Sequence, residues 1–254
     1  MKDDNTESAL MNRLMELEKR RVEFTATVNH NLKTPLNGII GFSSVLLAEA
    51  NNLEPEQRHQ LRLVYDSARQ LLDRIDTLLV LQRMESGKIH PCHDWFAPGD
   101  MLSELAANSA DAAKRNGIEL VTNLESCPNK LFSDMNLIRR AIQEFLDNSI
   151  RFGSKGTCTL GMAIESQHQK NSYLVKFTVT NQGAVAKERK EKLITSLNSS
   201  MGYLNTSFDG LGLGLALARQ VAIILDGHIE PDLDDDKTTF SMVLQFDDKE
   251  IETA

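Results

Sequence analysis

The first third of the sequence carries an apolar pattern that restricts it to long, paired helices. Between residues 8 and 86 glycine occurs only at Gly38 and Gly41. Apolar side chains recur there at steps of three and four residues, which places them in a narrow stripe along one side of a helix in a left-handed bundle. We call this stripe the seam. Its members are Leu10, Leu14, Leu17, Phe24 and Val28 in the first half and Leu61, Val64, Ala68, Leu71, Ile75 and Leu78 in the second.

A short break at residues 51–55 divides the seam into two arms. It contains two asparagines and ends at Pro55, a residue favoured in the first turn of a helix. The sequence therefore predicts a long antiparallel helical hairpin over residues 8–90. More apolar side chains widen the surface beyond what two helices can cover: Ile39, Phe42, Leu46, Leu72 and Leu79. We expect a homodimer that forms a four-helix bundle, the alternative being that the second half of the chain covers this surface.

The rest of the chain, residues 97–250, has a mixed pattern. Helical periods are predicted over 101–116, 136–151 and 211–225, and alternating strands over 118–122, 158–164, 173–180 and 238–246. This order favours an antiparallel or mixed sheet with helices on one face. The fold class is therefore α+β: a helical hairpin followed, after a linker rich in proline and glycine, by an α/β sandwich.

Composition excludes several classes of protein. The formal net charge is −8, which argues against a nucleic-acid partner because phosphate neutralisation needs an excess of Lys and Arg. No apolar run reaches the roughly 18 residues that span a bilayer, and the acidic N-terminus is not that of a signal peptide. The three cysteines form no CxxC pair, so neither a disulfide framework nor a zinc site is expected. These features fit a cytoplasmic chain.

His30 is the first candidate for chemistry. It lies two residues after Val28, about 200° around the helix from the seam, and should face solvent, with Lys33 and Thr34 on the same side. Pro35 inside the helix removes a backbone donor and bends the chain, at a cost of roughly 3 kcal/mol relative to alanine. A costly bend beside an exposed imidazole indicates a site; the alternative is a surface histidine next to a packing kink.

The stretch from Phe24 to Gly41 resembles the phosphoacceptor box of sensor histidine kinases, and the hairpin resembles their dimerisation and phosphotransfer domain. The resemblance implies that His30 takes a phosphoryl group from ATP and passes it to an aspartate in the receiver domain of a response regulator. The family usually has Glu or Asp next, as a base that orients the ring. Asn31 stands there instead and, being uncharged, implies slower phosphorylation. Thr34 matches the position that phosphatases of the family use to orient water.

A second resemblance concerns residues 143–152, which are similar to the N box of these kinases. Glu144 and Asn148 are one turn apart, and Arg151 follows one turn later on the same helix. The resemblance implies that Asn148 holds Mg²⁺ through its amide oxygen and that Arg151 meets phosphate. Kinases usually have Asn where Glu144 stands. Glu there is closer to the gyrase and Hsp90 ATPases, in which it activates water.

Two glycine-rich segments complete the resemblance. Gly210, Gly212 and Gly214 match the second glycine box, whose backbone N–H groups approach phosphates at a helix N-terminus. Residues 201–209 match the lid over ATP. The first glycine box departs from the family: Asn181 and Gly183 stand in an NxGxV run instead of DxGxG. Losing the charge that accepts from the adenine amino group costs roughly 1.5–3 kcal/mol, or about 10- to 150-fold in affinity.

The sequence as a whole predicts the catalytic core of a sensor histidine kinase with weakened use of ATP and Mg²⁺. It would be a small cytosolic kinase or the cytoplasmic part of a membrane-bound sensor. The alternative is a catalytically impaired pseudokinase or phosphotransfer adaptor that forms a heterodimer with another histidine kinase. A gyrase-like ATPase motor, suggested by Glu144, leaves the acceptor hairpin unexplained.

Overall fold

The computed structural model describes residues 31–50, 52–124, 127–167, 172–183 and 211–252, together with single positions at 13, 16, 185, 190, 191, 193, 194 and 197. The chain divides into two compact units on either side of the Arg83–Met84 bond. No helix in the described ranges combines the length and apolar character needed to cross a bilayer.

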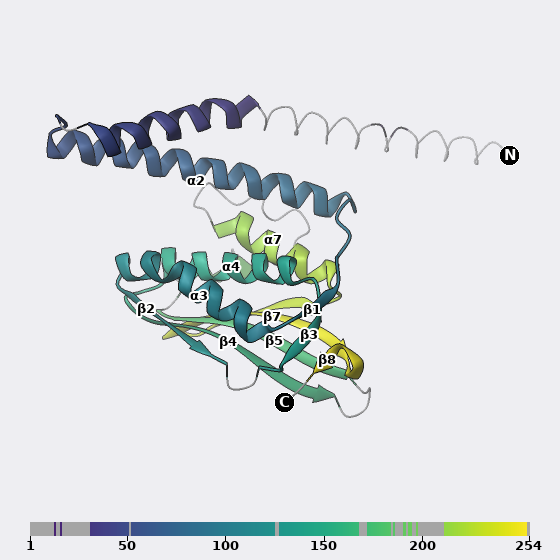
Figure 1. The fold of residues 1–254 in the computed structure, drawn as a ribbon. Helices are drawn as coiled ribbons and strands as arrows, with labels where there is room; N and C mark the ends of the chain where they lie inside the picture. The colour runs from purple at the N-terminus through teal and green to yellow at the C-terminus, as the bar shows by residue number, and fades with distance from the viewer. Residues whose placement is uncertain are drawn as a thin grey trace. The chain divides into compact units, whose positions relative to one another are not determined.

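The first unit is an antiparallel helical hairpin, as predicted (Figure 1). A helix over residues 31–49 pairs with α2 (Pro55–Glu85). At the turn, the guanidinium of Arg58 donates to the carbonyl oxygens of Leu47 at 2.7 Å and Ala50 at 2.8 Å. It thereby satisfies acceptors that the end of the first helix would otherwise leave free. Further along, Lys33 forms an ion pair with Asp76.

The hairpin has a small internal core. Leu36 of the first helix and Ala68 and Ile75 of α2 are buried together, with Ile40, Leu72 and Leu79 packed around them. The seam of α2 is divided between two environments, because Ala68 and Ile75 are buried while Val64 and Leu71 remain about half exposed. The part of the seam between Leu10 and Val28 lies outside the described residues.

The second unit is an α/β sandwich, as predicted. Its main sheet has the order β2-β4-β5-β7-β6. The strands are β2 (Ile118–Asn123), β4 (Gly156–Gln167), β5 (Ser172–Gln182), β6 (His228–Leu233) and β7 (Lys237–Asp247). Only the β2–β4 pair is parallel; the other three pairs are antiparallel. The sequence predicted four of these five strands and missed β6.

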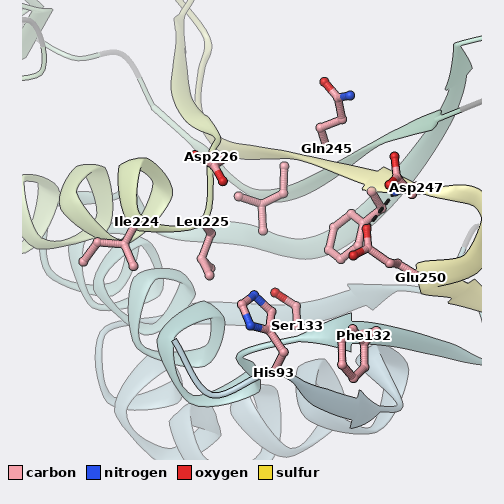
Figure 2. Close-up of a pocket in the computed structure, with 11 residues that line it drawn as sticks. His93, Phe132, Ser133, Ile224, Leu225, Asp226, Gln245, Asp247 and Glu250 are labelled. Carbon is pink, nitrogen blue, oxygen red and sulfur yellow. Dashed lines mark hydrogen bonds between the residues drawn. The ribbon is translucent and has the colours of Figure 1, made fainter. Parts of the chain in front are cut away.

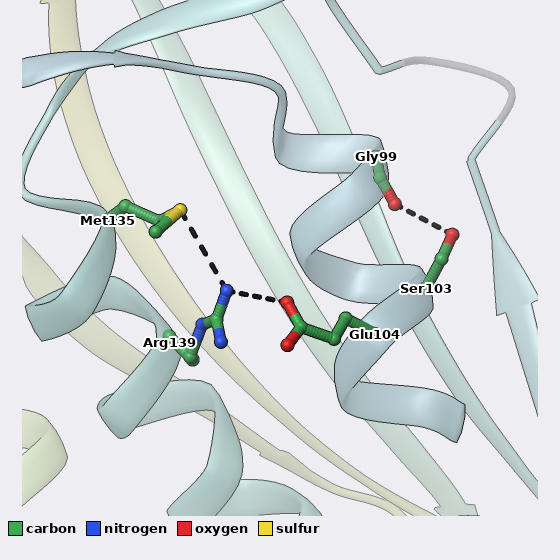
Figure 3. Close-up of polar contacts among 5 residues, drawn as sticks. All are labelled: Gly99, Ser103, Glu104, Met135 and Arg139. Carbon is green, nitrogen blue, oxygen red and sulfur yellow. Dashed lines mark hydrogen bonds and ion pairs between the residues drawn. The ribbon is translucent and has the colours of Figure 1, made fainter. Parts of the chain in front are cut away.

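Three helices cover one face of this sheet: α3 (Pro98–Arg115), α4 (Met135–Phe152) and α7 (Leu211–Ile224) (Figure 1). Alternate residues of β5 are buried, as are the consecutive residues 240–244 of β7, and the Phe145 ring of α4 stacks on Phe240 with 5.7 Å between centroids. An ion pair also joins two of the helices, since Arg139 of α4 meets the Glu104 carboxylate of α3 at 2.8 Å (Figure 3).

A second, three-stranded sheet was not predicted from the sequence. It has the antiparallel order β1-β3-β8, formed by β1 (Asp94–Phe96), β3 (Lys130–Ser133) and β8 (Ile251–Glu252), with the short helix η1 (Asp248–Glu250) leading into β8. Trp95 of β1 packs on Phe132 of β3 at 5.5 Å between ring centroids. This small sheet ties the beginning of the second unit to its C-terminal end.

Candidate functional site

The polar face of α4 carries the N-box residues. Asp134 caps the helix by accepting from the Leu137 N–H at 3.0 Å. The opposite face, which includes Ile138, Ile142 and Phe145, is fully buried. This strong division fixes the rotation of α4 on the sheet and leaves Glu144 and Asn148 half-buried on the other side.

Asn148 has an amide nitrogen without a partner in the described part of the chain. Its Nδ2 is buried and makes no hydrogen bond there. A buried donor without a partner costs about 1–3 kcal/mol, so this amide is suited to a ligand. Mg²⁺ prefers a few oxygen ligands from the protein and takes the rest from phosphates and water. An Asn148 oxygen with the Glu144 carboxylate one turn earlier fits that requirement.

Asn181 lies at the end of β5, next to α4. It is 7% exposed, its Oδ1 accepts from the Ser149 hydroxyl at 3.1 Å, and its Nδ2 donates to the Gln182 carbonyl at 3.1 Å. Ser149 directly follows Asn148 on α4, so this bond attaches the first glycine box to the N box. Sequence reasoning missed Ser149. A small hydroxyl residue on the otherwise apolar face of α4 was the signal that could have indicated a buried polar partner.

Gly183 follows Asn181 in a conformation that suits glycine. Its φ is +108°, and a Cβ there would clash with the side chain of Ser154. The loop is held on both sides: the Gly183 N–H donates to the Asp236 carbonyl at 2.9 Å, and its own carbonyl accepts from the Thr238 hydroxyl at 3.0 Å. The first glycine box is therefore a rigid turn against the β6–β7 hairpin.

The second glycine box meets α4 from the other side. Gly212 and Gly214 are buried in the first turns of α7, and a Cβ added at Gly214 would collide with the Glu144 carboxylate. A side chain at position 214 would displace the Glu144 carboxylate, which is the flexible end of its side chain. Glycine at this position therefore leaves the carboxylate in place, in addition to its predicted role in approaching phosphates. Gly210 and the predicted lid lie outside the described residues.

The remaining site residues are placed as follows. Arg151 is exposed near the end of α4, with its guanidinium 5.8 Å from the centre of the Phe152 ring. In the hairpin, Asn31 and Thr34 are exposed one turn apart on the first helix. His30 lies outside the described residues, so its predicted exposure remains a prediction. The structure brings together Glu144, Asn148, Asn181, Gly183 and Gly214 around α4.

One cysteine thiol lies close to this cluster but is unreactive. Cys158 on β4 is fully buried and neighbours Ser149. Burial raises the pKa of Cys158 to about 11, with the Ser149 hydrogen bond opposing the rise. The residue therefore stays a neutral thiol near pH 7 and is not a nucleophile.

Comparison with known families matches both units. Residues 20–87 match the His Kinase A (phospho-acceptor) domain, and residues 133–248 match the histidine kinase-, DNA gyrase B- and HSP90-like ATPases. The chain belongs to the sensor histidine kinases. The first match contains His30, Asn31 and Thr34, and the second contains all the other predicted site residues of this kinase core.

Individual relatives agree with this assignment. The hybrid signal transduction histidine kinase L of Dictyostelium discoideum is 24% identical over 248 residues, 96% of this chain and 14% of its own length. BarA, a signal transduction histidine-protein kinase of Escherichia coli K12, is 27% identical over 220 residues, 85% of this chain and 24% of its own length. The kinase core therefore spans less than a third of either relative.

Two solved structures share the fold. The crystal structure of full-length ShkA in complex with AMPPNP aligns with a TM-score of 0.63 at 23% identity, covering 91% of this chain and 46% of ShkA. The Acinetobacter baumannii histidine kinase AdeS aligns with a TM-score of 0.55 at 16% identity, covering 85% of this chain and 96% of AdeS. At these identities the likeness concerns the fold alone.

Proposed function

We propose that this kinase core binds ATP between α4 and α7 and transfers its γ-phosphoryl group to His30, from which it passes to an aspartate of a response-regulator receiver domain. Membership of the histidine kinase family supports the reaction class. ShkA was crystallised with AMPPNP, an ATP analogue, which supports the choice of nucleotide. Since ATP is supplied in the cytoplasm, we expect the reaction to take place there.

One observation carries the nucleotide site: both glycine boxes contact α4 on either side of Asn148. Glu144, one turn before Asn148, approaches Gly214, and Ser149, the next residue, bonds Asn181. A nucleotide whose base lies near Asn181 would then extend its phosphates past Asn148 toward the N-terminus of α7. Free N–H groups and the helix dipole favour anions at such a terminus.

The residues of α4 also fit the cation that phosphoryl transfer needs. We infer that Asn148 and Glu144 would hold Mg²⁺ through oxygen atoms, because both are half-buried and one turn apart. When bound, Mg²⁺ neutralises charge that builds up between the phosphates. Arg151 is exposed at the end of the same helix and is suited to meet a phosphate oxygen.

The transfer step requires a nucleophile and a route for its proton, and both would be on the hairpin. A ring nitrogen of His30 forms a bond to the γ-phosphorus while the bond to the β–γ bridging oxygen breaks, and that electron pair leaves with ADP. The proton on the other ring nitrogen must then depart. Asn31 can accept a hydrogen bond from that N–H and orient the ring, but its uncharged amide does not take the proton, which passes to water. This predicts slow turnover.

Labelling with radioactive ATP and Mg²⁺ tests this proposal. The parent chain should acquire acid-labile, base-stable label, and His30→Ala should lose it. His59→Ala, which removes an exposed histidine from α2, is the matched control and should retain the label. Equal labelling of the His30→Ala variant and the parent would contradict the assignment of the acceptor.

One observation favours a second function, that of a regulator without kinase activity. Both polar atoms of Asn181 already bond within the protein, to Ser149 and Gln182, so adenine would compete for an uncharged acceptor. Such a chain would act by pairing its hairpin with that of another histidine kinase. Calorimetric titration with ATP separates the two functions: binding with labelling supports the kinase, and absence of binding supports the regulator.

We also propose that the hairpin forms a homodimer. Phe42, Val45, Val64 and Leu71 are 76%, 51%, 50% and 47% exposed, respectively. Large apolar side chains exposed along both arms indicate a surface that a second hairpin covers, giving the four-helix bundle. The receiver domain of the response regulator would dock on the same hairpin near His30.

A further inference from the structure

A cavity of about 390 Å³ lies in the second unit, away from the nucleotide site. It opens between the C-terminal end of α7, the small sheet and the end of β7. Figure 2 shows Asp226 and Leu225 on one side of the cavity and Ser133, His93 and Phe132 on another. Its volume falls in the range of small-molecule pockets, about 300–1,000 Å³. The cavity uses none of the residues assigned above to the kinase reaction.

The charges around the cavity have one sign. Asp226, Asp247 and Glu250 line it, and no lysine or arginine does so within the described part of the chain. The C-terminal end of α7 adds the negative pole of a helix dipole. A group that enters this cavity therefore meets a potential that favours positive charge.

Two of these carboxylates are held in place before any ligand arrives. Glu250 Oε2 accepts from the Asp247 N–H at 2.8 Å, and the Asp247 carboxylate accepts in return from the Glu250 N–H, which forms a capping box around η1 (Figure 2). Each carboxylate keeps further lone pairs for a ligand. Asp226 lies just after α7, where its backbone adopts a left-handed conformation with φ +55°.

Ser133 supplies an independent indication of a ligand. The residue is 5% exposed, yet it lines the cavity, and its hydroxyl makes no hydrogen bond within the described ranges. The hydroxyl oxygen is not itself enclosed by protein atoms, so it is accessible to a group in the cavity. Figure 2 shows Ser133 beside the His93 ring, which itself stacks on Phe132 with 5.9 Å between centroids. The hydroxyl is thus a free acceptor or donor at the wall of the cavity.

The other walls are apolar. Leu225, Leu244 and Phe246 line the cavity and are buried, and Phe132 adds an aromatic ring. An inorganic cation would leave these walls in contact with water. An organic cation satisfies both parts of the lining, since its apolar body covers the walls and its charged group meets the carboxylates.

We propose that this cavity binds a small organic cation, an ammonium or guanidinium group carried on an apolar stem. The cation is a free amine or the basic side chain of a polypeptide, and the two share the same recognition chemistry. Because the cavity is large enough for a whole small molecule, we expect the free amine to bind more tightly.

The test uses the full chain without nucleotide and compares three ligands of similar shape by ¹H–¹⁵N NMR and calorimetry. Phenethylamine should bind and shift the amide resonances of Ser133, Asp226 and Asp247. Neutral 2-phenylethanol and anionic 3-phenylpropionate should bind weakly or not at all. If the amine binds no more tightly than the alcohol, the proposal is wrong. A capped arginine tripeptide forms the second arm, and the tighter of the two cations identifies the source.

Variants locate the binding. Asp226→Asn keeps a residue that tolerates the left-handed conformation and should weaken phenethylamine binding about fivefold at low salt. Ser133→Ala breaks no internal hydrogen bond and should weaken it about two- to tenfold. Asp232→Asn on β6 removes the same charge outside the cavity and should have no effect. Equal weakening by Asp232→Asn and Asp226→Asn would show attraction to net charge alone and would overturn the proposal.

Discussion

The two units of this kinase core bury their apolar residues to different extents. In the second unit α3, α4 and α7 cover one face of the sheet, and residues such as Phe145, Phe177 and Met242 are fully buried. In the described part of the hairpin, residues 31–50 and 52–85, few side chains are enclosed, and Phe42, Leu63 and Val64 are at least half exposed. This difference is what our proposal of a hairpin dimer rests on: the described apolar residues of the ATP-binding unit are covered within one chain, whereas those of the hairpin await a partner.

The largest expected effect is on dimerisation through the exposed apolar surface of the hairpin. Leu71→Asp places a charge on the exposed part of the seam, twice in each dimer, and should weaken dimerisation at least about 100-fold. Analytical ultracentrifugation over a dilution series measures the change. Ile223→Asp on α7 alters a side chain of similar exposure, 45% against 47%, and should leave the oligomeric state unchanged. A parent chain that is already monomeric would show that the hairpin needs no second copy.

The next effect lies in the nucleotide site. Asn181→Asp restores a charged acceptor next to Ser149 and should strengthen ATP binding about 10- to 150-fold. Calorimetry of both proteins with ATP and Mg²⁺ gives the ratio. Asn116→Asp, at the C-cap of α3, adds the same charge elsewhere as a control. Unchanged affinity in Asn181→Asp would mean that the base does not contact this residue.

A smaller effect concerns the stability of the self-contained unit. Gly183→Ala forces a side chain into φ +108° and against Ser154, and should lower the free energy of unfolding by about 1–3 kcal/mol. Gly99→Ala is the control, because a Cβ at this position of α3 would be 4.0 Å from its nearest neighbour, Cys127 Cβ. Urea denaturation should separate the two variants. Equal stability would show that the turn at Gly183 can relax.

The smallest expected effect concerns the stability that an ion pair gives to the hairpin. Lys33 and Asp76 form an ion pair whose side chains are 32% and 45% exposed. Such a pair contributes about 0.2–1 kcal/mol, less at high salt, so Lys33→Met and Asp76→Asn should each destabilise the chain only slightly. A double-mutant cycle in urea isolates the coupling. Coupling well above this range would mean that polar contacts, and not a partner, hold the hairpin together.

The sequence predicted the helices and strands that are long enough to show a repeating apolar pattern. The hairpin and the three helices of the second unit follow from apolar spacing, and β4, β5 and β7 follow from alternation over many residues. It did not predict β1, β3 and β8, because strands of two to four residues contain too few positions to establish a period. These strands are defined by their pairing with distant segments, which a local pattern does not contain.

The candidate site was predictable to a similar degree. Motif resemblance identified Glu144, Asn148 and Asn181, and the structure places them around one helix. The contacts between them depend on packing: the Ser149–Asn181 bond needs the register of β5 against α4, and the close approach of Gly214 to Glu144 needs the packing of α7 on α4. Neither could be obtained from residue spacing. The position of His30 remains a prediction.

The most direct test of the account is to locate the nucleotide on the protein. The ¹H–¹⁵N NMR spectrum of the full chain is followed during titration with AMPPNP and Mg²⁺. The account predicts that the backbone amides of Asn148, Gly183 and Gly212 shift together, at the places where α4 meets the two glycine boxes, while those of Trp95 and Glu252 in the small sheet stay in place. Saturable shifts confined to the small sheet, or no shifts at millimolar nucleotide, would contradict it.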